Sequence, residues 1–197
     1  MGWVFTLRAG LKFMKQLKTA ANYLFLLLVA GCAVSTTPVS DFRMGLAAYK
    51  QADYVEALSW YQRAADKGLA DAQNNLGELY QGLPGVPEDL SKALYWYRLA
   101  AQQGNIKAMT HLSLMYEMGR GVPQDFAETL KWLRRAADSD ASAQFRLGNI
   151  YHWGQGVPQD INEAMKWYRL AAAQGHMNAN VAIECHTSVS RECAYLK

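Results

Sequence analysis

The chain has 197 residues, of which 51% are hydrophobic and 19% charged; this is typical of one or two small globular domains and excludes a disordered chain. The formal charge is +3, but four of the 20 basic residues and none of the 17 acidic ones precede residue 32. The remainder holds 16 basic and 17 acidic residues, with no run rich in lysine or arginine. A near-neutral body gives no electrostatic reason to expect nucleic-acid binding.

The first recognisable segment, residues 14–32, reads MKQLKTAANYLFLLLVAGC. A short basic stretch precedes an apolar run that ends in small residues, which is the layout of a secretory signal. The apolar run is shorter than the roughly 20 residues that a membrane-spanning helix needs. We therefore expect a signal peptide over residues 1–31, with its true start at Met1 or at Met14.

The end of this segment, Val29-Ala30-Gly31-Cys32, resembles the lipobox of bacterial lipoproteins. The resemblance implies that Cys32 is lipid-modified, and several acyl chains anchor a protein stably to a membrane. Residue 33 is not the aspartate associated with inner-membrane retention. We therefore expect a lipoprotein of the bacterial envelope, in the outer membrane and facing the periplasm. The alternatives are an ordinary cleaved signal with a chance cysteine and a plain membrane anchor.

The segment after the signal is short and polar. Residues 33–40 read AVSTTPVS, with one proline, and such a composition favours a flexible chain. We interpret residues 32–40 as a lipidated tether, after which a helical body begins at residue 41.

A five-residue phrase recurs in the body, as GVPED at 85–89 and as GVPQD at 121–125 and 156–160. The spacings are 36 and 35 residues. A period of about 20 to 50 residues indicates an array of stacked structural repeats rather than a site assembled once. Tryptophans follow the same period: Trp60, Trp96, Trp132 and Trp167.

The spacing of apolar residues inside a unit predicts two helices. Both helices present one apolar face, and in the second helix small alanines stand beside a tryptophan, which suits close helix packing. The first helix of the unit that starts at residue 72 shows this face in Ala72, Leu76, Leu79 and Tyr80. The second helix shows it in Ala93, Trp96, Tyr97, Ala100 and Ala101.

The recurring phrase is the hinge between these helices. Its glycines end the first helix, where glycine adopts a left-handed backbone at little cost, and its valine is expected to pack on the core. Proline prevents the first helix from continuing. The aspartate caps the second helix, and Asp125 with Glu128, like Asp160 with Glu163, has the spacing of a capping box. We therefore expect these aspartates to be structural and not catalytic.

This pattern resembles the Sel1-like repeat family, a relative of the tetratricopeptide repeat. The resemblance implies an all-α fold: a right-handed α/α superhelix of antiparallel helix pairs, with about ten helices. Unit three departs from the pattern, because Ser113 replaces a glycine and Leu133 replaces the tyrosine after tryptophan. The matching positions in unit two are Leu76, Gly77, Tyr80, Gly85, Val86, Pro87, Asp89, Ala93, Trp96, Tyr97, Ala100, Ala101 and Gly104.

The first and last units are atypical, as the ends of a repeat array should be. The first lacks the glycine loop and resembles a plain tetratricopeptide repeat, and the last stops matching soon after residue 176. The predicted organisation is a first repeat over 41–68, Sel1-like repeats over 69–104, 105–140 and 141–175, and capping helices over 176–197.

Two cysteines lie in the last segment. Cys185 and Cys193 would be about 12 Å apart in one straight helix, which is too far for a disulfide. Since cysteines of exported proteins oxidise, we expect a disulfide between them, and the chain must then turn after residue 185. Two free thiols are the alternative.

The sequence carries no recognisable catalytic or phosphate-binding motif. We therefore expect no enzyme activity, no cofactor and no metal. Four histidines lie in different units, without the spacing of metal ligands, and are expected at the surface or at unit boundaries: His111, His152, His176 and His186.

What the family resemblance implies instead is a concave groove lined by the first helix of each pair. It places apolar anchors for a peptide and amides for its backbone in that groove. The implied groove residues are Tyr49, Asn74, Glu78, Thr110, Leu114, Glu117, Phe145, Asn149, His152 and Trp153.

The sequence thus predicts a monomeric, non-enzymatic interaction module, held on a membrane by its N-terminal lipid, that binds a protein or peptide. Some cysteine-rich secreted relatives have been linked to penicillin binding and β-lactamase activity, so an enzyme of that class is one alternative. A secreted factor that binds a host protein is another.

Overall fold

The computed structural model describes residues 37–187, and this range is helical, without a strand. The all-α fold of antiparallel helix pairs is therefore confirmed. The helices in chain order are α2 (Pro38–Lys50), α3 (Tyr54–Asp66), α4 (Ala70–Leu79), α5 (Leu90–Gln102), α6 (Ile106–Met118), α7 (Phe126–Ala137), α8 (Ala141–Trp153), α9 (Ile161–Ala173) and α10 (Met177–Thr187).

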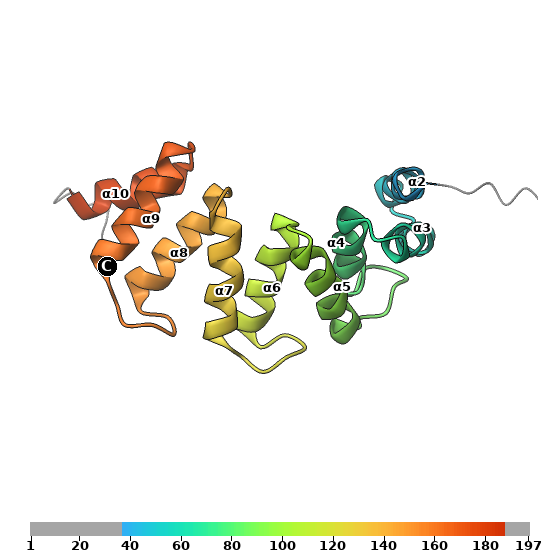
Figure 1. Cartoon of the computed structure of the whole chain (residues 1–197), viewed down its shortest axis with the longest axis horizontal. Helices are drawn as coiled ribbons and strands as arrows, with labels where there is room; N and C mark the ends of the chain where they lie inside the picture. The colour runs from blue at the N-terminus through green and yellow to red at the C-terminus, as the bar shows by residue number, and fades with distance from the viewer. Residues whose placement is uncertain (1–36, 188–197) are drawn as a thin grey trace, which may run out of the picture. The chain divides into compact units, whose positions relative to one another are not determined.

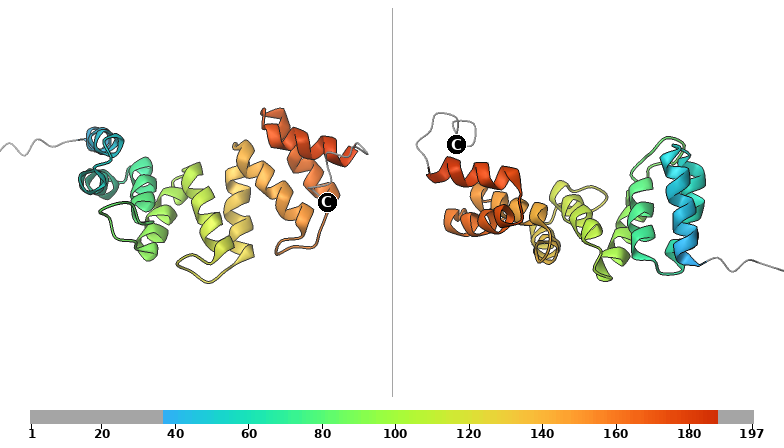
Figure 2. Two further views of the ribbon diagram at one scale, coloured as in Figure 1. Left: turned by 180° about the vertical axis from the view of Figure 1, so that it is seen from behind. Right: turned by 90° about the horizontal axis from the view of Figure 1, so that it is seen from above.

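Helices pair with their neighbours in the chain, and α10 packs on α9. Figures 1 and 2 show the hairpins α2–α3, α4–α5, α6–α7 and α8–α9 following one another in order. The core runs between hairpins: one cluster joins Tyr97 of α5, Leu112 of α6, Leu133 of α7 and Leu147 of α8, all fully buried. Each hairpin therefore needs its neighbours in order to bury its apolar face.

The hinge aspartates cap the second helices as predicted. Asp125 Oδ1 accepts from the backbone N–H groups of Ala127 and Glu128 at 2.8 and 3.1 Å. The reciprocal half of the predicted capping box is wrong, however. The Asp125 backbone N–H donates to the carbonyl of Tyr116, and the Glu128 carboxylate accepts from the Trp132 indole N–H at 2.9 Å. The carbonyl left free at the end of the first helix thus takes the place of the glutamate.

The hinge glycines end α6 and α8 as predicted, whereas the C-cap of α4 is Tyr80, before the glycines of its hinge. Gly119 and Gly154 are the C-caps of α6 and α8, with φ of +67° and +68°, in the left-handed region that glycine tolerates best. The hinge valines pack on the core: Val86 is buried, and Val122 and Val157 contact the main cluster.

In three of the four hairpins, α2–α3, α4–α5 and α8–α9, a glycine of the first helix packs against a tyrosine of the second helix. A Cβ atom on Gly77 would lie 2.7 Å from Tyr97 Cε1, and one on Gly148 would lie 2.4 Å from Tyr168 Cδ1. In unit three this pair is Ser113 and Leu133, both fully buried. The two sequence departures therefore compensate each other, because a smaller partner leaves room for the serine.

The predicted tether ends too late. Pro38 begins α2, because proline has no N–H to leave unsatisfied in a first turn and its φ already suits a helix. Asp41, in that turn, is fully buried and pairs with Lys67 at 2.6 Å and with Arg63 at 3.6 Å, so it ties α2 to the end of α3.

Several predictions fall outside the described residues: the signal peptide, Cys32, most of the tether, and Cys193. The predicted C-terminal cap is described as α10 up to Thr187. Within residues 37–187, no helix is both long enough and apolar enough to cross a membrane.

Candidate functional site

Side chains cross between the first helices of successive units. At the junction of α4 and α6, His111 Nε2 lies 3.3 Å from Glu78 Oε1, and the His111 ring stacks on Tyr97 of α5 with ring centroids 4.7 Å apart. Burial raises the pKa of Glu78, but hydrogen bonds from His111 and Asn74 outweigh burial and hold this pKa below its ordinary value. The imidazole thus fills the space between the two helices.

The junction of α6 and α8 is closed in the same way by a different side chain. Arg146 donates to Ser113 Oγ at 3.1 Å and forms an ion pair with Glu117. Both charged side chains are three-quarters buried, so the guanidinium fills this junction as His111 fills the previous one.

The junction of α8 and α10 is open. His111 and Arg146 each stand three residues after a buried alanine of their helix, and α10 has Ala182 at this position. A methyl group at that position cannot reach α8. The contacts across this junction come instead from His186, whose ring lies 6.4 Å from that of His152 between centroids, and from His176, which stacks on Phe145 at 4.6 Å. A cavity of about 500 Å³ remains beside them. Its described lining comes from α8, α9, α10 and the hinge: Phe145, Asn149, His152, Trp153, Gln159, Ile161, Tyr168, Asn178, Val181, Ala182, Cys185 and His186.

The cavity wall is aromatic. Phe145 lies 5.6 Å from Tyr168 between ring centroids, and His152 lies 4.6 Å from Trp153. The Tyr168 hydroxyl donates to Asn149 Oδ1 at 2.9 Å. Burial raises the pKa of Tyr168 to about 12, so this hydroxyl stays a neutral donor. Trp153 is 49% exposed and forms the rim.

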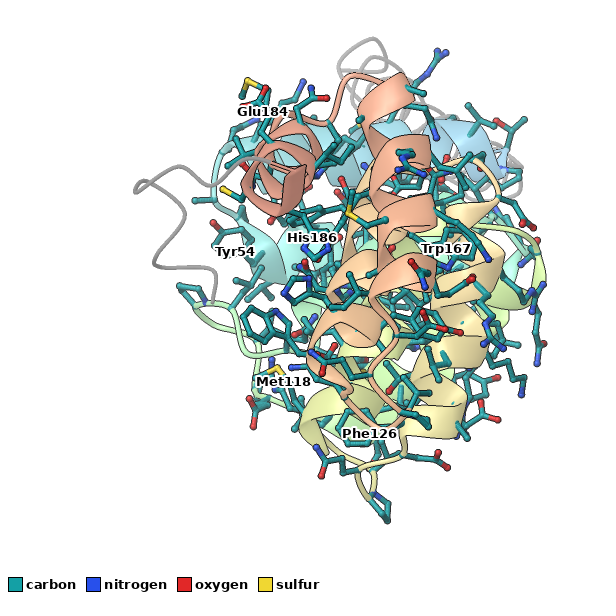
Figure 3. All side chains as sticks on the ribbon, turned by 90° about the vertical axis from the view of Figure 1, so that its left-hand side faces the viewer. Tyr54, Met118, Phe126, Trp167, Glu184 and His186 are labelled. Carbon is teal, nitrogen blue, oxygen red and sulfur yellow. The ribbon has the colours of Figure 1, made fainter. Side chains whose placement is uncertain are left out.

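The cavity is neutral. No aspartate, glutamate, lysine or arginine belongs to the described lining. Figure 3 shows Glu184 and His186 on opposite sides of α10, so the nearby carboxylate of Glu184 points away from the side that carries the lining residue His186. The site is therefore suited to an uncharged, partly apolar group.

A smaller recess of about 260 Å³ adjoins the cavity and shares Asn149 and Trp153 with it. Arg146 and Glu117, already paired with each other, form its polar wall. On the same helix as Glu117, Met118 is 62% exposed. The two hollows together make a surface that passes from α6 across α8 to α10.

The structure divides the predicted groove residues into two groups. Phe145, Asn149, His152 and Trp153 come together at the cavity, and Glu117 lies in the adjoining recess.

The other five lie elsewhere. Asn74 is buried and bonded to Glu78, and the Thr110 hydroxyl donates to the Ile106 carbonyl of its own helix. Tyr49 packs edge-on against Tyr54, and Leu114 is 38% exposed on α6.

The groove prediction missed the part of the cavity that comes from α9 and α10, because it considered only first helices with clear repeat matches. Ile161, Tyr168, Val181 and His186 were not named as site residues. The signal that could have found the cavity is the alignment of Ala182 with His111 and Arg146, which is readable once the units are superposed.

Cys185 is disulfide-bonded and lines the cavity. Its pairing with Cys193 stays a prediction, because Cys193 lies outside the described range. Within residues 37–187, no group of three or more histidine, cysteine or acidic side chains is placed to hold a metal ion.

Comparison with known proteins assigns the repeat. A Sel1 repeat profile matches residues 42–69, 70–105, 106–140 and 141–176, well over half of the chain. The chain belongs to the Sel1-repeat family. The match includes the first hairpin of this Sel1-repeat protein, although that hairpin lacks the glycine loop.

Two solved structures resemble this Sel1-repeat protein over most of its length. A Sel1 repeat protein from Oxalobacter formigenes is 32% identical, with a TM-score of 0.71, over 86% of this chain and 71% of its own. The protein c5321, a protective antigen present in uropathogenic Escherichia coli strains, is 34% identical, with a TM-score of 0.71. That similarity covers 81% of this chain and 36% of c5321.

Curated relatives match shorter stretches. A Helicobacter pylori protein named "Putative beta-lactamase HcpD" is 32% identical over 73 residues, which are 36% of this chain and 24% of that protein. DAP3-binding cell death enhancer 1 from Rattus norvegicus is 43% identical over 49 residues, which are 25% of this chain and 10% of that protein. The chain thus spans a quarter or less of these relatives.

Proposed function

We propose that this Sel1-repeat protein is a non-enzymatic interaction module that binds a peptide segment of a partner protein at the cavity between α8, α9 and α10. The observation that carries the proposal is the open last junction, about 500 Å³ in volume. It combines an aromatic wall with a few amide and imidazole groups, which is the composition of a binding pocket.

The surroundings of the cavity favour a peptide over a small molecule as the ligand. The recess at Glu117 and Arg146 continues the hollow towards α6, and Trp153 borders both hollows. An extended peptide could therefore place one side chain in the cavity and run along the recess. Exposed aromatic residues of this kind are frequent anchors of interfaces.

The test is retention of a random peptide library by the purified mature protein. We expect a defined set of peptides to bind and Trp153→Ala to weaken their binding at least about tenfold, a loss of about 1.4 kcal/mol. Leu170→Ala is the matched control, because Leu170 is equally exposed on α9 but lies outside the described cavity lining. Peptides that bind both variants as well as the wild type would place the binding surface elsewhere.

We further propose that the module is held on the envelope by a lipid on Cys32, in the outer membrane and facing the periplasm. The signal-like layout of residues 14–32 and the lipobox-like end support this. Labelled palmitate and membrane fractionation test it: Cys32→Ala should lose both label and membrane association. Ala33→Asp is the matched variant, which should keep the label and move to the inner membrane. Unchanged fractionation of Cys32→Ala would contradict the anchor.

The similarity to the Helicobacter pylori protein named as a β-lactamase favours a second candidate, hydrolysis of β-lactams. No serine or lysine belongs to the described cavity lining, which argues against an acyl-enzyme mechanism there. Nitrocefin turnover by the purified protein above a blank would support this second candidate over the binding module.

A further inference from the structure

The three junctions from α4 to α10 differ in both the side chain at the crossing position and its acceptors. Glu78 contacts His111 and stands six residues after the buried alanine of its first helix. In the last complete unit, Asn149 occupies the same position. Glu117 pairs with Arg146 and stands nine residues after the buried alanine of its own first helix. In the last complete unit, His152 occupies the same position. The last junction therefore lacks both a long side chain at the position of His111 and Arg146 and the two carboxylates, and its ring contacts to α8 come from His176 and His186.

The contact made by Tyr97 of α5 indicates what kind of group the cavity at Tyr168 of α9 can accept. Tyr97 and Tyr168 stand directly after the tryptophan of their units. At Tyr97, the next first helix places His111 on the ring, with an interplanar angle of 16°. At Tyr168, the next first helix offers Ala182, and Tyr168 borders the cavity instead. Tyr168 is only 3% exposed, because Phe145 and His152 of α8 lie against its ring. The space for a planar group at this junction is therefore bordered by Phe145, Trp153 and Tyr168 together.

We infer that the cavity receives an aromatic side chain of the partner peptide, tyrosine above all, which packs among Phe145, Trp153 and Tyr168. This inference rests on the proposed function, because it names the side chain by which the peptide of that proposal is held.

The charges around the cavity exclude a cationic side chain as its occupant. In the earlier junctions His111 and Arg146 meet Glu78 and Glu117. Asn149 and His152 cannot compensate a buried cation, and burying a charge without a partner is costly. A carboxylate side chain would find imidazole and amide groups but no lysine or arginine in the described lining to neutralise its charge, and an uncompensated buried charge is costly. The ligand group is therefore uncharged.

The shape of the lining selects a ring over an aliphatic chain. Phe145, Trp153 and Tyr168 border the space from α8 and α9, and aromatic rings gain from offset or edge-to-face contacts with one another. Asn178 lies at the α10 side of the cavity, where its amide can bond a phenol hydroxyl, since a buried polar tip needs a partner. Tyrosine has both a ring for the aromatic lining and a hydroxyl for the Asn178 amide.

The test introduces a larger side chain at position 182, where it would occupy the cavity. Ala182→His and Ala182→Arg restore a crossing side chain, and Ala173→His is the matched control on an exposed alanine of α9 outside the described lining. Peptides retained by the wild type are sequenced and titrated against each variant. Separately, N-acetyl-tyrosine amide and N-acetyl-leucine amide are titrated by NMR, with circular dichroism to show that each variant keeps its helix content.

We expect the retained peptides to share an aromatic residue, the tyrosine probe to shift cavity resonances more than the leucine probe, and both Ala182 variants to weaken peptide binding at least about tenfold. Ala173→His should bind as the wild type does. Peptides that bind without an aromatic residue, or with no loss in the Ala182 variants, would overturn this inference and leave the proposed function standing. No retained peptide together with a tyrosine-probe shift would overturn the proposed function and the peptide part of this inference, and would leave only a cavity that accepts an aromatic group. Neither signal would overturn that as well.

Discussion

The junction between α4 and α6 and the junction between α8 and α10 are built on the same repeat, yet one is closed and the other is open. In the first, His111 stacks on Tyr97 and reaches Glu78. In the second, Ala182 leaves Tyr168 bordering a cavity. The same position of the repeat therefore carries a crossing side chain at the closed junction and an alanine at the junction that keeps a cavity.

The largest expected difference between the junctions is in the cost of removing their tyrosines. Tyr97 is fully buried, so Tyr97→Ala should lower the free energy of unfolding by about 3–5 kcal/mol. Tyr168→Ala should cost less, because Tyr168, although only 3% exposed, borders the cavity on one side. Urea denaturation of both variants measures this. Equal losses would mean that the last junction is packed like an inner one.

The next effect concerns the glycine–tyrosine pairs. Gly77→Ser should cost about 1–3 kcal/mol through overpacking, because a Cβ there would lie 2.7 Å from Tyr97 Cε1. Adding Tyr97→Leu recreates the pair found at Ser113 and Leu133. A double-mutant cycle should then show a favourable coupling of about 0.5–3 kcal/mol. Strictly additive losses would refute the idea that the two departures compensate.

A smaller loss of stability, with a new binding property, is expected from His111→Ala. Removing the partly exposed hydrogen bond between His111 and Glu78 should cost about 1 kcal/mol, and it should leave the Tyr97 ring uncovered in a second cavity. NMR titration should then show two sites for N-acetyl-tyrosine amide instead of one. Lys107→Ala, an exposed change one turn earlier on α6, is the control. A single site in His111→Ala would mean that the open junction needs more than a missing crossing side chain.

The smallest effect is a dependence of stability on pH. The pKa of Glu78 is below its ordinary value of 4.5 in the folded chain, so the carboxylate stabilises the fold above that value. This contribution is lost as the pH falls through the lowered pKa. Glu78→Gln should therefore show a flatter fall in melting temperature below about pH 4.5 than the wild type, with Glu184→Gln, an exposed change on α10, as the control. Parallel curves for wild type and Glu78→Gln would assign the acid sensitivity to other carboxylates.

Much of the fold could be predicted because it depends on residues close together in the chain. The capping role of Asp125 and the C-cap at Gly119 follow from local backbone chemistry, and both are confirmed. The start of α2 was predicted too late, because the reason for ordering Asp41 lies 26 residues away at Lys67. The capping box failed at Glu128 for a similar reason, since the Asp125 N–H donates to the carbonyl of Tyr116 in the preceding helix.

The candidate site was only partly predictable. The family resemblance led to Phe145, Asn149, His152 and Trp153, which do line the cavity, but it gave equal weight to Asn74 and Glu78, which are engaged with each other and with His111. Whether a groove position is free depends on the side chain that arrives from the next unit, which the periodicity of one helix does not reveal.

The sequence by itself determined that this chain is a Sel1-type array of helical hairpins, because the period, the hinge phrase and the helix caps are local properties written into each unit. Only the tertiary structure decided which junction is open. The contacts that close a junction join residues such as Glu78 and His111, 33 positions apart, and their absence becomes a cavity only when α8, α9 and α10 are packed together.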